Sequence, residues 1–254
     1  MTDLPTAILT SVHYSDLLSV TLPLNRKHFG RVIVATTPDD VATQTVCIDN
    51  NAHCLVTRAF YDRGAMFNKG AAVERCLEMS GEMSSRRGWI VVMDADIIIP
   101  EDSDLLASAI PGNLYTPARL MDRSGFTQTA KRHCWPNVEK RAKEEFAGYF
   151  QMFHASDSVL GDRPWYPTQW SHAGGSDSEF WRKWPKNRRI RPPFEVLHLG
   201  EDGKNWTGRQ TPRLDGTFPP DAKRHAENME RLMKARDAAR RRPGFVDLTD
   251  EWIS

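Results

Sequence analysis

The sequence places two aspartates, Asp94 and Asp96, one residue apart at the end of an apolar run, GWIVVMDADIIIP (Gly88–Pro100). Two like charges at this spacing repel each other unless a cation lies between them. Carboxylate oxygens suit Mg²⁺ or Mn²⁺, and these ions commonly bind the phosphates of a substrate as well. The pair therefore indicates a site for a divalent cation and a diphosphate.

A pair of turn-capping residues is the competing interpretation of the same two aspartates. Roughly one Asp-x-Asp triplet is expected by chance in a chain of this length, so the triplet has little weight by itself. Its position at the carboxyl end of an apolar strand is what favours a cation site, provided that the surrounding elements form the right kind of sheet.

The N-terminal part of the chain alternates between strand-like and helix-like segments. The expected strands are Thr6–Val12, Arg31–Thr37, His53–Phe60 and Trp89–Asp94. This alternation predicts an α/β fold with a mostly parallel central sheet flanked by helices. Ligands of such sheets bind beyond the carboxyl ends of the strands, which is where Asp94 and Asp96 are expected to lie.

The rest of the chain has a different pattern. From Asn113 to Phe218 the periodicity is weak and Gly, Pro and Trp are frequent, which predicts a loop-rich part. After it, the sequence predicts one long helix from Asp221 to about Arg242.

Composition and simple motifs exclude several classes of protein. The formal net charge of +1 names no partner. No apolar run is long enough to span a membrane, and the N-terminus lacks the pattern of a signal peptide, so we expect a cytoplasmic protein. The four cysteines form no CxxC pair, which argues against a zinc knuckle or a disulfide framework and for a reducing compartment. They are Cys47, Cys54, Cys76 and Cys134.

Two familiar phosphate-binding loops are also excluded. GAMFNKG (Gly64–Gly70) has its glycines and lysine in the wrong order for a P-loop, and no GxGxxG follows the first expected strand. A nicotinamide-dependent enzyme or a P-loop kinase is therefore not expected.

Four motifs, in order, resemble those of the GT-A glycosyltransferases, above all the family-2-like enzymes and more distantly the β-1,4-galactosyltransferase and polypeptide GalNAc-transferase groups. They are FNKGAAVE (Phe67–Glu74), VVMDADIIIP (Val91–Pro100), AGGSDSEFWRKW (Ala173–Trp184) and VLHLG (Val196–Gly200). The resemblance covers roughly residues 6–210. It implies a Rossmann-like GT-A domain over residues 1–215, with a nucleotide-sugar-binding half (1–100) and an acceptor half (101–215). Residues 216–254 would then form a basic C-terminal helical extension.

The resemblance implies a metal-dependent, inverting transfer of a hexose from a nucleotide sugar, in the first place a UDP-sugar, to a hydroxyl group. Asp96 matches the aspartate that binds Mn²⁺ or Mg²⁺ directly in this family. Asp94 matches the aspartate that reaches the ribose, or the metal through water. His198 matches a late histidine ligand, although taken alone it reads as a buried core histidine.

Other residues match the donor-binding side of the family. Asn68 and Lys69 match a segment that lies against the nucleotide, whereas the plain interpretation of Lys69 is a surface residue in the first turn of a helix. The loop after the first strand matches the place where the family holds the base and the ribose. The residues implied to bind the donor are His13, Tyr14, Asp16, Asn68, Lys69, Asp94 and Ala95.

Asp177 matches the carboxylate that acts as general base in inverting members of the family. An acceptor hydroxyl is a poor nucleophile, and a positioned carboxylate must take its proton as it attacks. Ser176 departs from the pattern, since relatives usually carry an acid there, and Glu179 therefore stays a rival base. Without the resemblance, the segment reads as a turn followed by the first turn of a helix.

The implied acceptor-binding residues are Trp170, Gly174, Gly175 and Trp181. The two glycines are expected to turn the backbone sharply towards the substrate.

The acceptor is suggested only by charge. RKWPKNRRIR (Arg182–Arg191) holds six Lys and Arg residues and no acid, and the final helix is basic as well. A polyanionic acceptor, such as DNA carrying a hydroxymethylated base, is one interpretation; an intracellular glycan acceptor with a solvated basic face is the other. Two alternatives to sugar transfer stay open, namely a nucleotidyltransferase of related fold and a non-catalytic nucleic-acid-binding protein.

Overall fold

The computed structural model describes residues 4–121, 139–140, 148–200 and 203–240. Cys134 and the part of the expected final helix beyond residue 240 lie outside these ranges.

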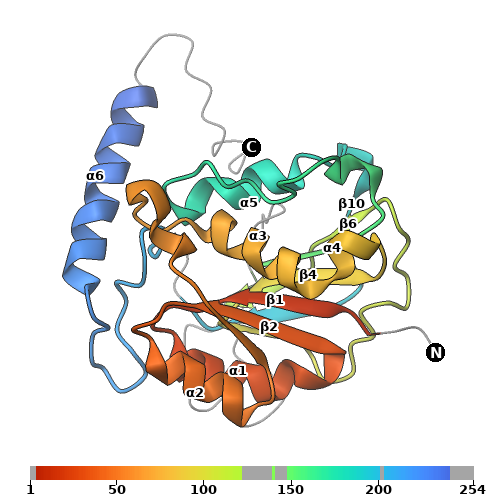
Figure 1. The fold of residues 1–254 in the computed structure, drawn as a ribbon, viewed down its shortest axis with the longest axis horizontal. Coiled ribbons are helices and arrows are strands. Elements are labelled where there is room, and N and C mark those ends of the chain that lie inside the picture. Colours follow the sequence, from red (N-terminus) through yellow and green to blue (C-terminus); the bar gives the residue numbers. More distant parts are fainter. Residues whose placement is uncertain (1–3, 122–138, 141–147, 201–202, 241–254) are drawn as a thin grey trace.

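A seven-stranded sheet forms the centre of the protein (Figure 1). The strands lie in the order β10-β6-β9-β4-β1-β2-β3, and only β9 runs antiparallel to its neighbours. They are β1 (Thr6–Thr10), β2 (Arg31–Thr36), β3 (His53–Val56), β4 (Trp89–Asp94), β6 (Leu114–Tyr115), β9 (Phe150–His154) and β10 (Arg189–Ile190). The predicted α/β fold with a mostly parallel sheet is thus confirmed. The third expected strand is shorter than predicted, because Ala59–Gly64 forms the 3₁₀ helix η2.

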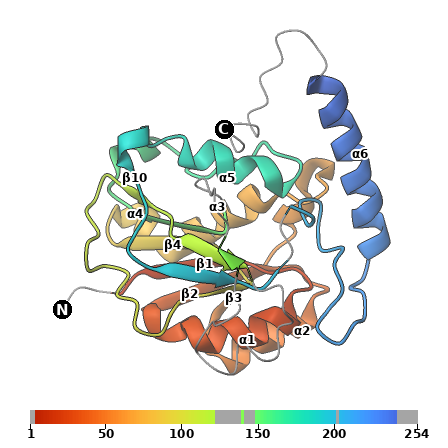
Figure 2. The same ribbon diagram turned by 180° about the vertical axis from the view of Figure 1, so that it is seen from behind.

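Helices cover both faces of this sheet (Figures 1 and 2). One face carries α1 (Ser15–Asn25) and α2 (Val41–Asp49), and the other carries α3 (Lys69–Ser80), α4 (Glu82–Ser85) and α5 (Ala173–Trp181). The start of α2 is fixed by the carboxylate of Asp40, which accepts a hydrogen bond from the backbone N–H of Thr43 at 3.2 Å. The start of α3 is fixed by the side chain of Asn68, which accepts from the backbone N–H of Ala71 at 2.9 Å. Both are N-cap bonds that satisfy otherwise unpaired helical donors.

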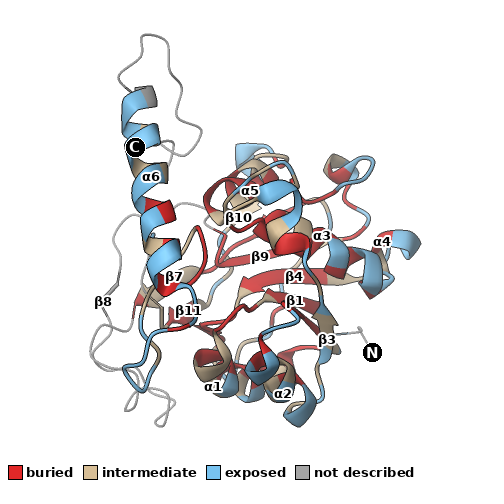
Figure 3. Ribbon diagram, turned by 60° about the vertical axis from the view of Figure 1, so that its left-hand side comes forward, coloured by how far each residue is buried: buried red, intermediate tan, exposed pale blue. Residues whose placement is uncertain are grey.

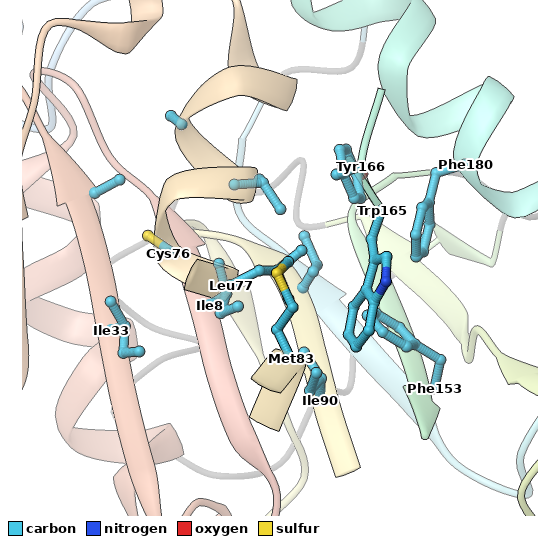
Figure 4. Packing of buried hydrophobic residues seen from close by; sticks show 14 of the residues in the cluster. Ile8, Ile33, Cys76, Leu77, Met83, Ile90, Phe153, Trp165, Tyr166 and Phe180 are labelled. Carbon is cyan, nitrogen blue, oxygen red and sulfur yellow. The ribbon is translucent and has the colours of Figure 1, made fainter. Parts of the chain in front are cut away.

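The strands contribute side chains to two hydrophobic cores, because successive side chains of a strand point to opposite faces of the sheet. In β1, Ile8 belongs to the core under α3 and α5, whereas Leu9 belongs to the core under α1 and α2. Figure 4 shows the first of these cores, in which Trp165 and Tyr166 lie close to Phe180 of α5. Strands buried on both faces explain why β1, β2 and β4 read as continuous apolar runs.

A second, smaller sheet has the strand order β5-β11-β7-β8. Its strands are β5 (Ile97–Ile98), β7 (Ala118–Met121), β8 (Glu139–Lys140) and β11 (Glu195–His198). β5 pairs antiparallel with β11, with His198 opposite Ile97. The apolar run that the sequence shows as one unit is therefore split between two sheets, and the Asp94–Asp96 segment lies at the junction. The short 3₁₀ helices are η1 (Arg26–His28), η3 (Ser158–Leu160) and η4 (Lys186–Arg188).

The long helix α6 (Ala222–Arg240) lies beside the edge at which β1 and β4 end (Figure 1). Much of its outer surface is exposed (Figure 3). In the described part of the chain, no helix combines the length and the apolar character needed to cross a bilayer. Strands from both sides of residue 100 share the central sheet, so the expected division into a nucleotide half and an acceptor half remains a prediction.

Candidate active site

The carboxyl ends of β1 and β4 lie side by side, with Thr10 opposite Asp94 in the register of the sheet. Asp94 is the last residue of β4, and its backbone N–H donates to the carbonyl of Tyr149 at 3.0 Å. Its side chain is about one third exposed. The predicted position of this aspartate at a strand end is therefore confirmed, and its carboxylate is open to solvent on one side.

Lys69 joins this strand end to helix α5. The Nζ atom of Lys69 lies 2.7 Å from Oδ1 of Asp94 and 3.1 Å from Oδ2 of Asp177, and it donates to the carbonyl of Gly148 at 3.2 Å. Burial would lower the pKa of Lys69, but the charges of Asp177 and Asp94 outweigh it and hold that pKa above its usual value. Lys69 is thus a buried, charged bridge between two carboxylates, not a surface residue.

Asp177 is held from several directions. Its Oδ1 atom accepts a short hydrogen bond from the hydroxyl of Tyr166, and its backbone carbonyl accepts from Nε2 of Gln151 at 3.2 Å. Burial raises the pKa of Asp177, and although Lys69 counteracts this, the nearby charge of Asp94 adds to it and the pKa lies above its usual value. A buried carboxylate with a raised pKa is a stronger base than one in water.

Asp96 and His198 form the second pair of the site. Oδ2 of Asp96 lies 3.3 Å from Nε2 of His198. The pairing of β5 with β11 brings them together, and the backbone N–H of Leu199 donates to the carbonyl of Asp96 at 2.9 Å. A Cβ atom on Gly200 would overlap Oδ2 of Asp96, so glycine is needed at that position. Burial would raise the pKa of Asp96, but the neighbouring His198 holds it below its usual value.

The expected three-residue metal site is not present as such. Among the described residues, no three His, Cys, Asp or Glu side chains converge on one point. The carboxylate of Asp94 lies against Lys69, and its expected contact with the ribose, or with the metal through water, remains a prediction. Asp96 and His198 nevertheless fit a divalent cation, because Oδ1 of Asp96 is buried and has no hydrogen-bond partner among the described residues. A carboxylate and an imidazole leave open positions that substrate oxygens and water can fill.

Arg119 lies on the other side of His198 and was not identified from the sequence. Its Nη1 atom lies 3.2 Å from Nδ1 of His198, and its guanidinium group lies over the ring of Tyr149 at 4.6 Å. Nδ1 also lies 3.3 Å from Sδ of Met121. These neighbours fix the plane of the imidazole ring, so that Nε2 points at Asp96. A buried arginine in a strand of four residues carries no sequence signal that separates it from a surface residue.

In the loop between β1 and α1, which was expected to hold the base and the ribose, His13 and Asp16 contact other parts of the protein. His13 has a φ of 62°, a strained conformation for a residue with a side chain, and its backbone N–H donates to Oδ2 of Asp40 at 2.5 Å. The carboxylate of Asp16 is bound by both terminal nitrogens of Arg209, one of them at 2.9 Å, and by the backbone N–H of Leu214 at 2.9 Å. The carboxylate of Asp16 is thus engaged by Arg209 and Leu214, and its expected role in binding the ribose remains a prediction.

The other residues expected on the donor side play supporting parts. The guanidinium group of Arg209 lies over the ring of Tyr14 at 4.5 Å, which leaves that ring half-buried at the edge of the site. The side chain of Asn68 caps α3 and donates to the carbonyl of Thr168 at 2.8 Å. Ala95 is buried, and its carbonyl accepts from the hydroxyl of Thr21 at 2.6 Å. These residues shape the site through backbone and capping contacts, and their direct contact with a donor remains a prediction.

Asp16→Asn is expected to reduce the free energy of unfolding by about 3 kcal/mol at neutral pH. The reason is that the buried Arg209, whose side chain is 2% exposed, loses its counter-charge. Burial raises the pKa of Asp16, but Arg209 and the backbone of Leu214 hold it below its usual value. The stabilisation is therefore present above the unfolded-state pKa and is lost as the pH falls through the folded-state pKa.

Urea unfolding of both proteins, at neutral pH and in acid, tests this prediction of stability. Wild type and variant should differ at neutral pH and converge in acid. Glu230→Gln is the matched control, because its ion pair with Lys234 lies on the surface of α6 and contributes little. A difference between wild type and Asp16→Asn that does not change with pH contradicts the assigned ion pair.

The glycines expected to turn the backbone towards the acceptor lie inside helix α5. A Cβ atom on Gly174 would overlap the ring of Trp206, and one on Gly175 would overlap the ring of Trp170. The predicted sharp turn is therefore wrong, and the glycines instead let two indole rings pack against the start of the helix. Trp181 is also a correction, because it is 4% exposed and belongs to the hydrophobic core.

Glu179, the rival base, lies on the same helix but in other surroundings. Its carboxylate accepts hydrogen bonds from Nε2 of Gln169 at 2.6 and 2.7 Å and from Nε1 of Trp170 at 2.8 Å. No contact joins it to Lys69 in the described part of the chain. The geometry therefore favours Asp177 over Glu179 as the residue that faces the strand-end carboxylate.

The basic run lies at the far end of the sheet. β10 runs parallel to β6, and both run in the same direction as β4, since β9 is antiparallel to each of β4 and β6. The 3₁₀ helix Lys186–Arg188 precedes β10 and therefore lies at the amino ends of these strands (Figure 1). Asp94 lies at the opposite, carboxyl end, so Lys186 and Arg188 lie at the end of the sheet away from the candidate site.

No protein-family model matches the chain, and no curated protein matches it by sequence. Solved structures do match. Mannosyl-3-phosphoglycerate synthase from Rubrobacter xylanophilus is 14% identical, with 96% of this chain and 80% of that chain covered and a TM-score of 0.49. Glucosyl-3-phosphoglycerate synthase from Mycobacterium tuberculosis, in complex with Mn²⁺, UDP and glucosyl-3-phosphoglycerate, is 11% identical, with 78% and 73% covered and a TM-score of 0.45.

A third structure, 4-diphosphocytidyl-2C-methyl-D-erythritol synthase, is 14% identical, with 89% of this chain and 98% of that chain covered and a TM-score of 0.41. The first two are GT-A glycosyltransferases, the group that the ordered motifs resemble, and the third is a nucleotidyltransferase. At these identities and TM-scores, the similarity assigns no activity to this chain, and function must be inferred from the site.

Proposed function

We propose that this chain is a glycosyltransferase that moves a hexose from a nucleotide sugar, in the first place a UDP-sugar, to a hydroxyl acceptor with inversion at the anomeric carbon. The observation that carries the proposal is the Lys69 bridge, which holds the strand-end Asp94 and the buried Asp177 within 2.7 and 3.1 Å of one ammonium group. Such an arrangement places a base beside the end of the sheet where ligands of this fold bind.

The two pairs of the site form one electrostatic unit. The charge of Lys69 acts on Asp96, and the charge of Asp94 acts on His198. The donor's diphosphate would lie near Asp96 and His198, with the sugar between them and Asp177. A divalent cation bound by Asp96 and His198 would neutralise negative charge on the departing diphosphate.

Asp177 supplies the proton chemistry of the proposed reaction. The acceptor oxygen attacks the anomeric carbon and forms the new glycosidic bond, while the bond from that carbon to the diphosphate oxygen breaks and its electron pair leaves with the diphosphate. Asp177 takes the hydroxyl proton as the attack proceeds. Lys69 keeps Oδ2 of Asp177 oriented towards the strand end, and Asp94 balances the charge of Lys69 when Asp177 becomes neutral.

A nucleotidyltransferase is the alternative closest in fold. Its acceptor would be a phosphate group, which is already anionic and needs no base to remove a proton. The buried Asp177 with its raised pKa therefore favours a hydroxyl acceptor and sugar transfer. The nucleic-acid-binding alternative, and DNA as an acceptor, drew on the basic run and on the basic final helix. The 3₁₀ helix Lys186–Arg188 of the run lies at the opposite end of the sheet from Asp94 and gives them no support. Helix α6 lies beside the edge at which β4 ends, so the two alternatives stay open.

A thermal-shift screen of nucleotide sugars with and without Mn²⁺ tests the proposed donor class. A ligand that binds only the folded state raises the Tm, by an amount that grows with the ratio of its free concentration to its Kd. One nucleotide sugar should raise the Tm in the presence of Mn²⁺ and less without it, and free UDP should share part of the effect. A rise in Tm with nucleoside triphosphates, and no rise with any nucleotide sugar, would contradict the proposal.

A further inference from the structure

Two buried side chains, Tyr166 and Gln151, contact Asp177 and have no part in the reaction described above. Tyr166 comes from the loop before α5, and Gln151 comes from β9 of the central sheet. Both are completely buried. Polar side chains at such depth lose their hydration, so their hydrogen bonds must serve structure or chemistry.

The amide of Gln151 has only one orientation that satisfies its neighbours. Its Nε2 atom donates to the backbone carbonyl of Asp177 at 3.2 Å, and a carbonyl can only accept. Its Oε1 atom therefore faces the hydroxyl of Tyr166, at 2.9 Å. Turning the amide round would place the amide oxygen against the backbone carbonyl of Asp177 and lose that contact.

The hydroxyl of Tyr166 thus faces two acceptors with a single proton. One acceptor is Oδ1 of Asp177, and the other is Oε1 of Gln151. When Asp177 is ionised, the charged oxygen is the stronger acceptor and takes the phenolic proton. When Asp177 has accepted a proton, Oδ1 becomes a weaker acceptor and the phenol can donate to Oε1 of Gln151. A proton on Oδ1 of Asp177 can then be donated to the phenolic oxygen, so Tyr166 stays hydrogen-bonded to the base in both of its protonation states.

Packing keeps the phenol in place for this role. The ring of Tyr166 is stacked on Phe180, which lies on the same helix as Asp177, with ring centres 4.5 Å apart and planes 26° apart (Figure 4). The carboxylate of Glu74 on α3 accepts from the backbone N–H groups of Trp165 and Tyr166 at 3.2 and 3.0 Å. Helix α3 thereby holds both Lys69 and the loop that presents Tyr166.

We propose that Tyr166 and Gln151 are positioning residues for the base Asp177, which they orient before and after proton transfer. This inference rests on the proposed sugar transfer. A hydrogen bond to a charged group is roughly twice as strong as one between neutral groups, so Tyr166→Phe is expected to lower kcat by about 10- to 100-fold. The KM for the donor should not change, because neither residue contacts Asp96 or His198 among the described residues.

The pH profile and a matched control distinguish a positioning role of Tyr166 from a purely structural one. The other charged groups that act on Asp177 are Lys69 from α3 and Asp94 from β4. With these unchanged, loss of the phenolic donor should move the acidic limb of the kcat/KM profile to higher pH, since that donor stabilises the carboxylate. Tyr115→Phe removes another buried hydroxyl, which accepts from the backbone N–H of Ile110 at 2.8 Å, and should leave kcat and the profile unchanged.

The experiment measures kcat, KM and the pH profile for wild type, Tyr166→Phe, Tyr115→Phe, Asp177→Asn and the double variant Tyr166→Phe/Asp177→Asn. In the background of Asp177→Asn, Tyr166→Phe should cause little further loss, because the two residues act as one unit. If Asp177→Asn is inactive while Tyr166→Phe behaves like Tyr115→Phe, the positioning role is overturned and the proposed function stands. If wild type transfers no sugar from any donor, the proposed function and this role fail together.

Discussion

Asp177→Asn is expected to lower turnover by about 10²–10⁴-fold while the Kd for the donor stays near that of wild type. The substitution keeps the shape of the side chain and leaves an oxygen to accept from Tyr166, but it removes the group that takes the proton. Lys69 keeps Asp94 and the carbonyl of Gly148 as partners, so the site should stay assembled. Initial rates with saturating donor, together with calorimetric titration of the donor, separate the two quantities.

Glu179→Gln is the matched control for this prediction. Glu179 lies two residues further along α5, and its carboxylate is occupied by Gln169 and Trp170, away from the Lys69 bridge. The turnover of Glu179→Gln is expected to stay within a few-fold of that of wild type. An inactive Glu179→Gln with an active Asp177→Asn would show that the base is the other carboxylate of the helix.

The second large effect is expected at Asp96. Asp96→Ala removes the buried Oδ1 atom, which has no hydrogen-bond partner in the described part of the chain, and with it the main proposed ligand for a divalent cation. Stabilisation by UDP plus Mn²⁺, measured as a rise in Tm, should therefore disappear in this variant. His198→Ala should weaken the same response more mildly, since a carboxylate suits Mn²⁺ better than an imidazole does.

Asp102→Ala provides a surface aspartate from the segment just after β5 as a control, and its response to UDP and Mn²⁺ should equal that of wild type. The experiment also has a chelator arm. Wild-type protein that binds its donor with full affinity in excess chelator would rule out a cation held by Asp96 and His198.

The parts of the fold that could be predicted from the sequence are those set by local pattern. β1, β2 and β4 read as apolar runs because both of their faces are buried, and the helices between them fix parallel pairing. The position of Asp94 at the carboxyl end of β4 follows directly. Since strand ends meet at one edge of a parallel sheet, a site near Asp94 and Asp96 could be predicted without any tertiary contact.

The contacts that complete the site could not be predicted, because they join residues far apart in the chain through short or irregular elements. β5 and β11 have too few residues to show a period, yet their pairing brings His198 to Asp96. Tyr166 reaches Asp177 from a loop without periodicity. No local rule in the sequence identifies either contact.

Two expectations were drawn from a residue type without its neighbours. The paired glycines Gly174 and Gly175 suggested a turn, but glycine also lacks a side chain, and here two indole rings occupy that space against a helix. Asp16 looked available for a ligand because its position in a polar loop gave no sign of Arg209, which lies in a distant segment and binds it through both terminal nitrogens.

The most direct test of sugar transfer is NMR of a reaction that contains wild-type protein, Mn²⁺, a hydroxyl acceptor and the nucleotide sugar found by thermal shift. Phosphorus spectra identify the phosphate product, and the proton coupling at the anomeric carbon gives the configuration of the new bond. The proposed mechanism predicts release of a nucleoside diphosphate and a glycoside of inverted configuration, with neither formed by Asp177→Asn at a comparable rate. Release of pyrophosphate, or a glycoside that keeps the donor's configuration, would contradict it.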